Sequence, residues 1–330
     1  MQKLGSESEF YDEELSAEEK DFYHRQFNLE GWSQKIIKNS RILIVGVGGL
    51  GCEIAKNLAM IGIGHLDLVD LDIIEHSNLS RQVLYKPGDE GRPKVEVAIE
   101  RLKEMNPYIS INGYYCSLER LDPAIYKAAD VIIGALDSRK SRVNLNAHSI
   151  RFKKPLVEGG VGGYLGYVYT NFPYENACSS EIPRERILRK RIPRKRIHCI
   201  LKAITVFKEK NQGTPPDPKN NGDIIFIQNY ANELVKKYSF SPPFIKEEIV
   251  NEVLRNPQLI TTIAVISAFQ AHQTIKILHW LKGNKSIGEP IRTFILYNAM
   301  TMQLFPMEIK RDPNCLICGE NVKRVNTTKQ

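Results

Sequence analysis

Three charged residues of the sequence suit chemistry on a phosphate, although they are widely spaced. Arg81 lies in "DLDIIEHSNLSRQVLY", Lys94 closes "GRPK" in the first turn of a predicted helix, and Asp137 lies in "GALDSRKSR". An arginine and a lysine stabilise negative charge on phosphates, and an aspartate can hold a magnesium ion that bridges them. Hydride transfer does not require these three residues together, so their presence favours nucleotidyl transfer. Each residue also has a structural alternative: Lys94 as a solvated helix residue, and Asp137 as the helix N-cap before Ser138.

A nucleotide is expected because an apolar strand runs through a glycine-rich turn into a helix at "ILIVGVGGLGCEIAKNLAMIG". Glycines permit the tight turn and let backbone amides approach a phosphate. The glycines concerned are Gly46, Gly48, Gly49 and Gly51. Asp70 ends the next predicted strand, where a ribose-binding acid belongs. An NAD(P)-dependent oxidoreductase is the alternative on this pattern, because such enzymes share it.

The elements that must position these residues alternate between strand and helix through the first half of the chain. Strands are predicted at 41–45, 65–70, 109–115, 130–135 and 155–157, and helices at 51–61, 93–105, 123–129 and 138–152. This alternation predicts an α/β fold with a doubly wound, Rossmann-like, mostly parallel sheet that binds ligands at the carboxyl ends of its strands.

The pattern changes after residue 172 and indicates a helical insertion. A basic segment and a Pro/Gly/Asn-rich loop precede predicted helices at 225–238, 245–255 and 258–282, and two antiparallel strands, "RTFILYN" and "MQLFPMEI", follow. We therefore predict a nucleotide-binding part at 1–174, a crossover segment with a helical insertion at 175–255, and a return to the first part at 256–330.

Charge, hydropathy and cysteine content argue against a nucleic-acid-binding protein, a membrane protein and a secreted disulfide-rich protein. The formal net charge of +8 is concentrated in the basic segment 184–196, without the aromatic platform of a nucleic-acid surface, so no nucleic-acid partner is expected. No apolar run is long enough to cross a bilayer, and no signal peptide is visible, so we expect a cytoplasmic protein without a membrane partner. Six cysteines without a secretory signal argue against a disulfide framework.

These motifs, in this order, resemble the ubiquitin-activating enzyme superfamily, which includes bacterial enzymes that activate sulfur-carrier proteins. The resemblance begins at "YHRQFNLEGW" and continues through "GVGGLGCE", "DLDIIEHSNLSRQ", "GRPK", "ALDSRKSR" and "GGVGGYLGYV" to "NAMTMQLF" and "CLICG". It implies an enzyme that uses ATP and magnesium to adenylate the C-terminal glycine of a ubiquitin-like protein ending in Gly-Gly.

The resemblance also implies a role for each motif residue. Gly46, Gly48 and Gly51 would form the phosphate loop, with Asp70 on the ribose and Asp72 and Asn78 lining the ATP site. Arg81 and Lys94 would hold the phosphates, and Asp137 would bind magnesium. Arg25 would reach the ATP of a neighbouring subunit, which implies a homodimer.

The cysteines leave two questions open. Relatives that pass the modifier onward form a thioester, and the position of their nucleophile corresponds here to Ile187, which cannot react. Cys199, which follows basic residues and His198, and Cys178 are the remaining candidates, with a packing role as the alternative for Cys199. A zinc site of the family would use Cys178, Cys315 and Cys318, with Glu181 as a doubtful fourth ligand.

We therefore predict an ATP-dependent activating enzyme for a ubiquitin-like protein. We expect thioester formation to follow adenylation and a conjugating enzyme to be a further partner. The first alternative is adenylation alone, as for a sulfur carrier, because Ile187 replaces the nucleophile. Two distant alternatives are an NAD(P)-dependent oxidoreductase and a non-catalytic subunit.

Overall fold

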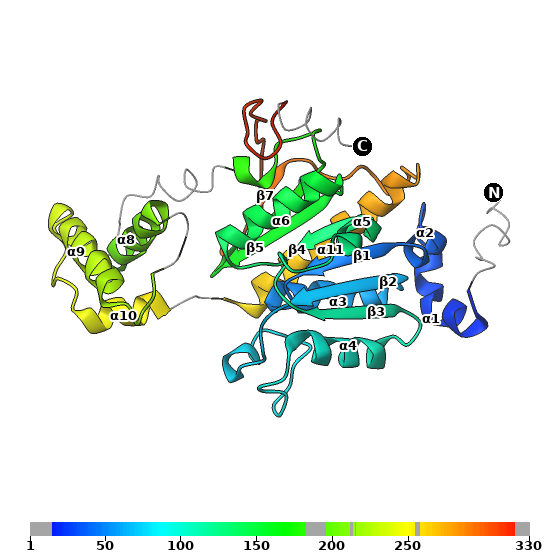
Figure 1. Ribbon diagram of the computed structural model, residues 1–330, viewed down its shortest axis with the longest axis horizontal. Helices are drawn as coiled ribbons and strands as arrows, with labels where there is room; N and C mark the ends of the chain where they lie inside the picture. Colours follow the sequence, from blue (N-terminus) through cyan, green and yellow to red (C-terminus); the bar gives the residue numbers. More distant parts are fainter. Residues whose placement is uncertain (1–14, 183–195, 212–213, 215, 255–257, 321–330) are drawn as a thin grey trace. The chain divides into compact units, whose positions relative to one another are not determined.

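The fold is built on one eight-stranded sheet (Figure 1). The computed structural model describes residues 15–182, 196–211, 214, 216–254 and 258–320. The strands lie in the order β3-β2-β1-β4-β5-β6-β7-β8. They are β1 (Arg41–Val45), β2 (His65–Asp70), β3 (Ser110–Tyr115), β4 (Val131–Gly134), β5 (Leu156–Gly162), β6 (Leu165–Asn171), β7 (Phe294–Asn298) and β8 (Gln303–Met307).

The sheet is parallel from β3 to β5 and antiparallel from β5 to β8, which confirms the predicted fold class. Strand β1 pairs with β2 on one side and with β4 on the other, so successive crossovers leave β1 in opposite directions. Ligands of such sheets bind beyond the carboxyl ends of the strands at this switch point. The glycine turn follows β1 directly.

Helices cover both faces of β1 and β4, which explains why these central parallel strands are apolar almost throughout. On β1, Ile42 and Ile44 belong to one core, which also contains residues of α3 (Gly49–Met60), α4 (Lys94–Met105) and α11 (Ile260–Leu281). Leu43 and Val45 belong to the opposite core, with residues of α5 (Pro123–Ala128) and α6 (Arg139–Phe152). This alternation follows from the two-residue period of a strand.

Two helices before β1 were not foreseen from the sequence. Helix α1 (Ala17–Phe27) begins with a capping box, in which the Ser16 hydroxyl accepts from the Glu19 backbone N–H and the Glu19 carboxylate accepts from the Ser16 N–H. Helix α2 (Gln34–Lys38) begins at Ser33, whose hydroxyl accepts from the Ile36 N–H. None of the described helices is long and apolar enough to cross a membrane.

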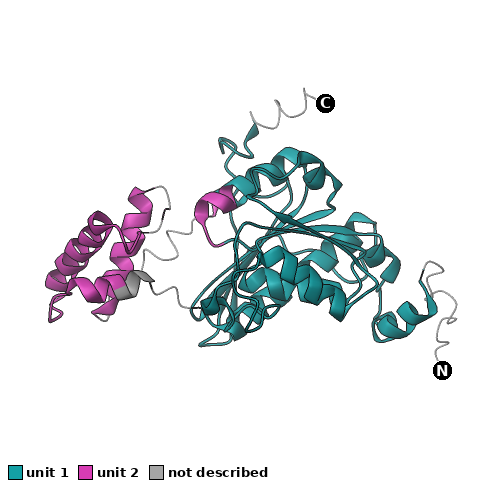
Figure 2. Cartoon of the chain, turned by 60° about the horizontal axis from the view of Figure 1, so that its bottom comes forward, with its two compact units in different colours: residues 1–136, 144–181, 258–330 teal, residues 137–143, 182–257 magenta. Residues whose placement is uncertain are grey.

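The chain divides into two compact units (Figure 2). The first comprises 1–136, 144–181 and 258–330, and the second comprises 137–143 and 182–257. The predicted parts place the insertion at 175–255 and do not include 137–143 in it.

The second unit is helical and has its own apolar core. It contains α8 (Ile197–Lys210), α9 (Asn221–Lys237) and α10 (Lys246–Leu254). Helix α8 falls where the sequence indicated only a crossover segment. Its buried residues Cys199, Ile200, Ala203 and Phe207 have helical spacing, which is the signal that would have identified it.

Candidate functional site

The glycine turn between β1 and α3 is packed tightly at two glycines and open at a third. Gly46 has a φ of +96°, and a Cβ there would lie 2.6 Å from the carbonyl oxygen of Ala135, just beyond β4. A Cβ on Gly51 would lie 1.9 Å from the Gly46 carbonyl oxygen. A Cβ on Gly48 would meet only Gln82 Nε2, at 3.9 Å. The turn therefore keeps its shape through Gly46 and Gly51 and leaves room beside Gly48.

The start of α3 supplies backbone donors to this open space. Gly48 is the N-cap and has no side chain to satisfy the first N–H groups of the helix. Such N–H groups, together with the helix dipole, attract a phosphate. The predicted phosphate loop therefore has both the donors and the space that this role requires.

Asp70 fixes the glycine turn at the end of β2. Its carboxylate accepts from the Val47 N–H at 2.6 Å and from the Asp72 N–H at 2.8 Å. Burial raises the pKa of Asp70, and this effect outweighs the opposing influence of the Lys94 ammonium. Asp70 thus lies beside the turn, where the sequence predicts a ribose-binding acid.

The segment that carries Arg81 crosses the glycine turn. A Cβ on Gly49 would lie 3.5 Å from the Arg81 carbonyl oxygen. The short helix η2 (His76–Asn78) precedes this segment, and the buried Asn78 side chain accepts from the Glu75 N–H at 3.1 Å. Asn78 therefore shapes the approach of Arg81 to the turn.

Lys94 and Asp72 form an ion pair, with 2.8 Å between Nζ and the carboxylate oxygen. The Lys94 side chain is only 8% exposed, whereas that of Asp72 is 55% exposed. The Lys94 N–H also donates to the Asp72 carbonyl oxygen at 3.0 Å. Lys94 is thus a largely buried cation held by one carboxylate, which excludes the alternative that it is a solvated helix residue.

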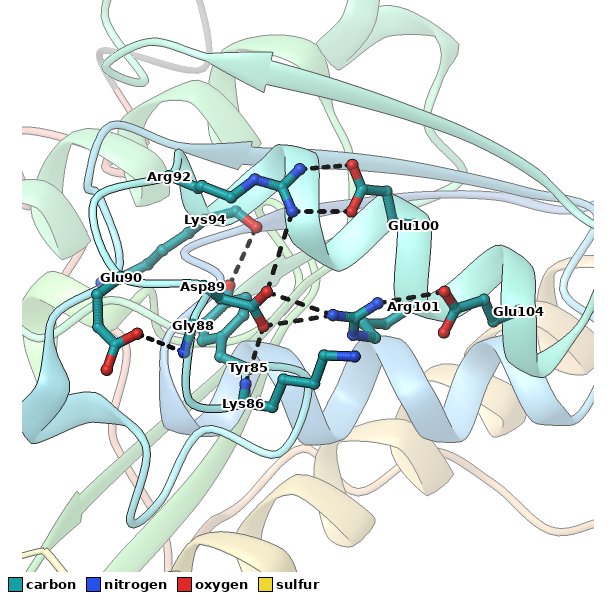
Figure 3. A network of polar contacts seen from close by, with 10 residues as sticks. All are labelled: Tyr85, Lys86, Gly88, Asp89, Glu90, Arg92, Lys94, Glu100, Arg101 and Glu104. Carbon is teal, nitrogen blue, oxygen red and sulfur yellow. Dashed lines mark hydrogen bonds and ion pairs between the residues drawn. The ribbon is translucent and has the colours of Figure 1, made fainter.

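A polar network holds the loop that leads into Lys94 (Figure 3). Buried Asp89 accepts from the Lys86 N–H at 2.9 Å and from the Arg101 guanidinium at 3.3 Å. The Tyr85 hydroxyl donates to the Lys94 carbonyl oxygen at 3.2 Å. The loop therefore fixes the backbone at Lys94 and leaves its ammonium to be directed by Asp72.

The two remaining charged residues of the predicted site are exposed. Asp137 follows β4 in the sequence and is grouped with the second unit. The N-cap of α6 is Ser138, whose hydroxyl accepts from the Ser141 N–H at 3.0 Å, so the alternative that Asp137 is the cap is wrong. Arg25 is exposed in the last turn of α1.

Four candidate zinc ligands converge, although they come from distant parts of the sequence. The ligand atoms of Cys178, Glu181, Cys315 and Cys318 all lie within 4.8 Å of one another. The Cys178 and Cys315 sulfurs are 3.8 Å apart, which is about the separation of two thiolates on a tetrahedral zinc with Zn–S bonds of 2.3 Å. The donor set of three sulfurs and one carboxylate therefore fits zinc.

Hydrogen bonds direct Glu181 into this cluster. Its carboxylate accepts from the Cys178 N–H, from the Asp312 N–H and, at 3.0 Å, from the Cys318 thiol. The neighbouring Cys318 thiol also lowers the pKa of Cys178, to about 6. The position that the sequence marked as doubtful is thus inside the cluster.

We expect the purified protein to contain about one zinc ion per chain, since three thiolates and one carboxylate supply the four ligands that a structural zinc ion takes. The double variant Cys315→Ser/Cys318→Ser should lose it, because two thiolates are removed. Elemental analysis by mass spectrometry checks this, with Cys116→Ser, which lies outside the cluster, as the matched control. Zinc retained in the double variant would contradict the assignment.

Cys199 is buried in the core of the second unit. Burial raises the pKa of its thiol, and this effect outweighs the opposing influence of Arg196 and Lys202. Arg196 forms an ion pair with Glu248 at 2.7 Å. The structure therefore does not place Cys199 as an exposed, activated thiol. Ile187 and the basic segment up to residue 195 lie outside the described residues.

Sequence reasoning missed one partner of the site. The Arg81 side chain donates to Gln258, which lies 177 positions further along the chain. Gln258 stands immediately after the second unit and belongs to no motif. No signal in the sequence marks this contact.

Comparisons with known proteins agree with this architecture. The chain is 29% identical over 311 residues to the molybdopterin-synthase adenylyltransferase of Escherichia coli, covering 93% of this chain and 99% of that protein. It is 27% identical over 307 residues to the NEDD8-activating enzyme E1 catalytic subunit of Arabidopsis thaliana, covering 86% of this chain and 66% of that protein. The crystal structure of E. coli MccB with ATP superposes with a TM-score of 0.60 at 21% identity, covering 91% of this chain and 74% of that chain, which supports the fold.

The predicted resemblance to the ubiquitin-activating enzyme superfamily is confirmed by these relatives and by a family model. That model, the ThiF family, matches residues 23–317. The match spans the glycine turn, the Arg81 segment, the second unit and the first cysteine of "CLIC". The chain belongs to the ThiF family.

Proposed function

We propose that this protein uses ATP and magnesium to adenylate the C-terminal carboxylate of a ubiquitin-like protein that ends in Gly-Gly. The observation that carries the proposal is the open space at Gly48, beside backbone donors, Asp70 and the Arg81 segment. Relatives named as an adenylyltransferase and as an E1 catalytic subunit support the same class of reaction. An oxidoreductase would leave the buried Lys94 unexplained.

In this reaction a carboxylate oxygen of the modifier forms a bond to the α-phosphorus of ATP. The bond from that phosphorus to the bridging oxygen breaks, and pyrophosphate leaves with the electron pair. Arg81 and Lys94 would neutralise the negative charge that the phosphates carry and develop. Asp137 would hold magnesium, which supplies further charge stabilisation on the phosphates.

Lys94 must change partners for this role. Its ammonium is bound to the Asp72 carboxylate at 2.8 Å, and a triphosphate, which carries more charge, competes for it. Asp72 would hold the ammonium near the glycine turn until ATP binds. The Asp72 carboxylate could then turn toward solvent, because its side chain is mostly exposed. This exchange of partners would occur when ATP binds, before the chemical step, so that the ammonium is already in place when charge develops on the phosphates.

Exchange of labelled pyrophosphate into ATP tests the proposal. We expect exchange that depends on a ubiquitin-like protein and that is lost when its last two glycines are removed. Asp137→Ala should raise the magnesium concentration for half-maximal exchange at least about tenfold, since one carboxylate ligand is removed. Glu289→Gln, an exposed acid in the first unit, is the control. Exchange with an unchanged magnesium requirement in Asp137→Ala would remove Asp137 from the site.

The second candidate function is adenylation without a thioester on the enzyme. The observation in its favour is the burial of Cys199, with the raised pKa of its thiol. A thioester at Cys199 or Cys178, which the resemblance predicts, would require that thiol to become accessible.

Non-reducing electrophoresis after incubation with ATP, magnesium and modifier separates the two candidates. Under the second candidate, wild type forms no adduct that a reducing agent removes. An adduct that is present in wild type and in Cys178→Ala but absent in Cys199→Ala would instead establish the thioester at Cys199. The reverse pattern would place it at Cys178.

Partners follow from the same proposal. Arg25 is exposed on α1 and available to a second copy of the chain, which supports a homodimer. A conjugating enzyme that receives the modifier belongs to the first candidate, since it requires the thioester. Size-exclusion chromatography with light scattering measures the oligomeric state directly.

A further inference from the structure

The guanidinium of Arg81 is held by two acceptors from different parts of the chain. Its Nη1 donates to the Ser77 carbonyl oxygen at 2.5 Å, and its Nε donates to the Gln258 side-chain oxygen at 2.8 Å. Neither of these bonds uses Nη2. A planar guanidinium with fixed Nε and Nη1 has a defined orientation, and its remaining donors point in a defined direction.

Gln258 is itself fixed by the sheet. It forms an isolated parallel bridge with Gly163, in the turn between β5 and β6. It also precedes α11, whose Ile263 lies close to Gly49 of the glycine turn. The backbone of Gln258 is thus tied to the same sheet that carries the nucleotide turn, so its side chain has a fixed base from which to reach Arg81.

We propose that Gln258 is a positioning residue for nucleotidyl transfer, and that it acts by orienting the Arg81 guanidinium toward the phosphates of ATP. This inference rests on the proposed function. Arg81 is otherwise a long side chain on an irregular segment, and such a side chain samples many rotamers. The Gln258 oxygen restricts it without neutralising it, because an amide accepts a hydrogen bond and carries no charge.

The neutral amide suits this role better than a carboxylate would. A glutamate at position 258 would keep the acceptor and would hold Arg81 by a charge-assisted bond. Its negative charge would also repel the phosphates and offset the charge of Arg81. The two properties of the residue, acceptor geometry and neutrality, therefore predict different effects on turnover and on ATP affinity.

The first test compares Gln258→Leu and Gln258→Glu with wild type in pyrophosphate exchange. Gln258→Leu removes the acceptor and should lower kcat about tenfold, as expected for the loss of a hydrogen bond to a charged group. Gln258→Glu should restore kcat to within about threefold of wild type and raise the KM for ATP at least about tenfold, because geometry returns while charge is added. Gln303→Leu, an exposed glutamine on β8, is the matched control and should change neither value.

The second test asks whether Gln258 acts through Arg81. Lysine has no Nε–H group to donate, so Gln258→Leu should lower kcat in wild type and add nothing in an Arg81→Lys background. Pyrophosphate exchange at saturating ATP measures kcat for the four chains, and calorimetric titration verifies that each still binds ATP. The inference would be overturned if Gln258→Leu had equal effects in both backgrounds. It would also be overturned if Gln258→Leu and Gln258→Glu both lowered kcat equally and both lowered the melting temperature.

The failure of this inference is distinguishable from failure of the proposed function. A wild-type chain that binds ATP and supports exchange, with Gln258→Leu equal to it, would refute the role of Gln258 alone. A wild-type chain that binds no ATP would refute both.

Discussion

Replacing Lys94 with methionine is expected to lower kcat for pyrophosphate exchange by about 10²–10³-fold, the usual cost of one charge-stabilising donor. Methionine keeps an unbranched side chain in the same buried place, so the loss reports the ammonium group rather than its packing. The side chain is almost fully buried, and among the described residues its ion partner is Asp72. Steady-state exchange at saturating ATP measures kcat, and thermal denaturation verifies the fold.

Lys86→Met is the matched control for this prediction. Lys86 lies in the same loop, and its side chain is exposed, whereas its backbone N–H makes the contact with Asp89 (Figure 3). Its exchange rate should equal that of wild type. A second variant, Asp72→Asn, keeps a side chain of the same shape but removes the partner charge. If Lys94→Met retained more than about a tenth of wild-type kcat, the phosphate role of Lys94 would be wrong.

The second large effect is expected at Gly51, where alanine should destabilise the folded protein by about 3 kcal/mol, the upper end of the usual cost of overpacking. The added methyl would lie 1.9 Å from a backbone oxygen of Gly46, which cannot move without opening the turn. The variant should therefore unfold at a lower denaturant concentration, whether or not ATP is present. Urea unfolding followed by circular dichroism measures the difference.

Gly48→Ala provides the contrast. The methyl meets nothing closer than 3.9 Å, so the free energy of unfolding should change by no more than about 1 kcal/mol, as for a change of N-cap residue. The same methyl occupies the space into which we place a phosphate, and ATP binding should weaken about 30-fold, the equivalent of a close contact costing about 2 kcal/mol. A destabilised Gly48→Ala with normal ATP affinity would reverse the two assignments.

The sheet and the glycine turn were predictable because local sequence carries their signals. The central strands β1 and β4 are short apolar runs, and the turn requires glycine at Gly46, where φ is positive, and at Gly51, where a Cβ collides with backbone. The mostly parallel, doubly wound arrangement follows from the alternation of strand and helix. These features depend on neighbouring residues and therefore appear in the motif itself.

The pairings inside the site were not predictable in the same way. The sequence gives Asp72 and Lys94 separate places around the nucleotide, whereas the structure joins them in one ion pair. It leaves Cys199 open as a thiol activated by basic neighbours or as a packing residue, whereas the structure buries it, which raises the pKa of the thiol, and pairs Arg196 with Glu248. Charge near a residue in sequence does not determine its solvation, which depends on tertiary packing.

Helix α8 shows the same limit for secondary structure. Its buried residues have a clear helical period, whereas the basic run before it and the resemblance to a crossover segment do not indicate a helix. The apolar face of α8 packs in the core with residues of α9. The helical spacing of the apolar residues of α8 is visible in the sequence. The sequence does not show which helix packs against that apolar face.

The connectivity of the sheet has a consequence for how such a chain can diversify. The chain leaves the first unit after β6 and re-enters it at Gln258. The intervening helices are therefore an insertion between two fixed positions of the nucleotide-binding fold. Segments of different length could be exchanged there without disturbing any strand pairing. Position 258 would be the sensitive end of such an insertion, because replacing Gln258 would remove its hydrogen bond with the Arg81 side chain.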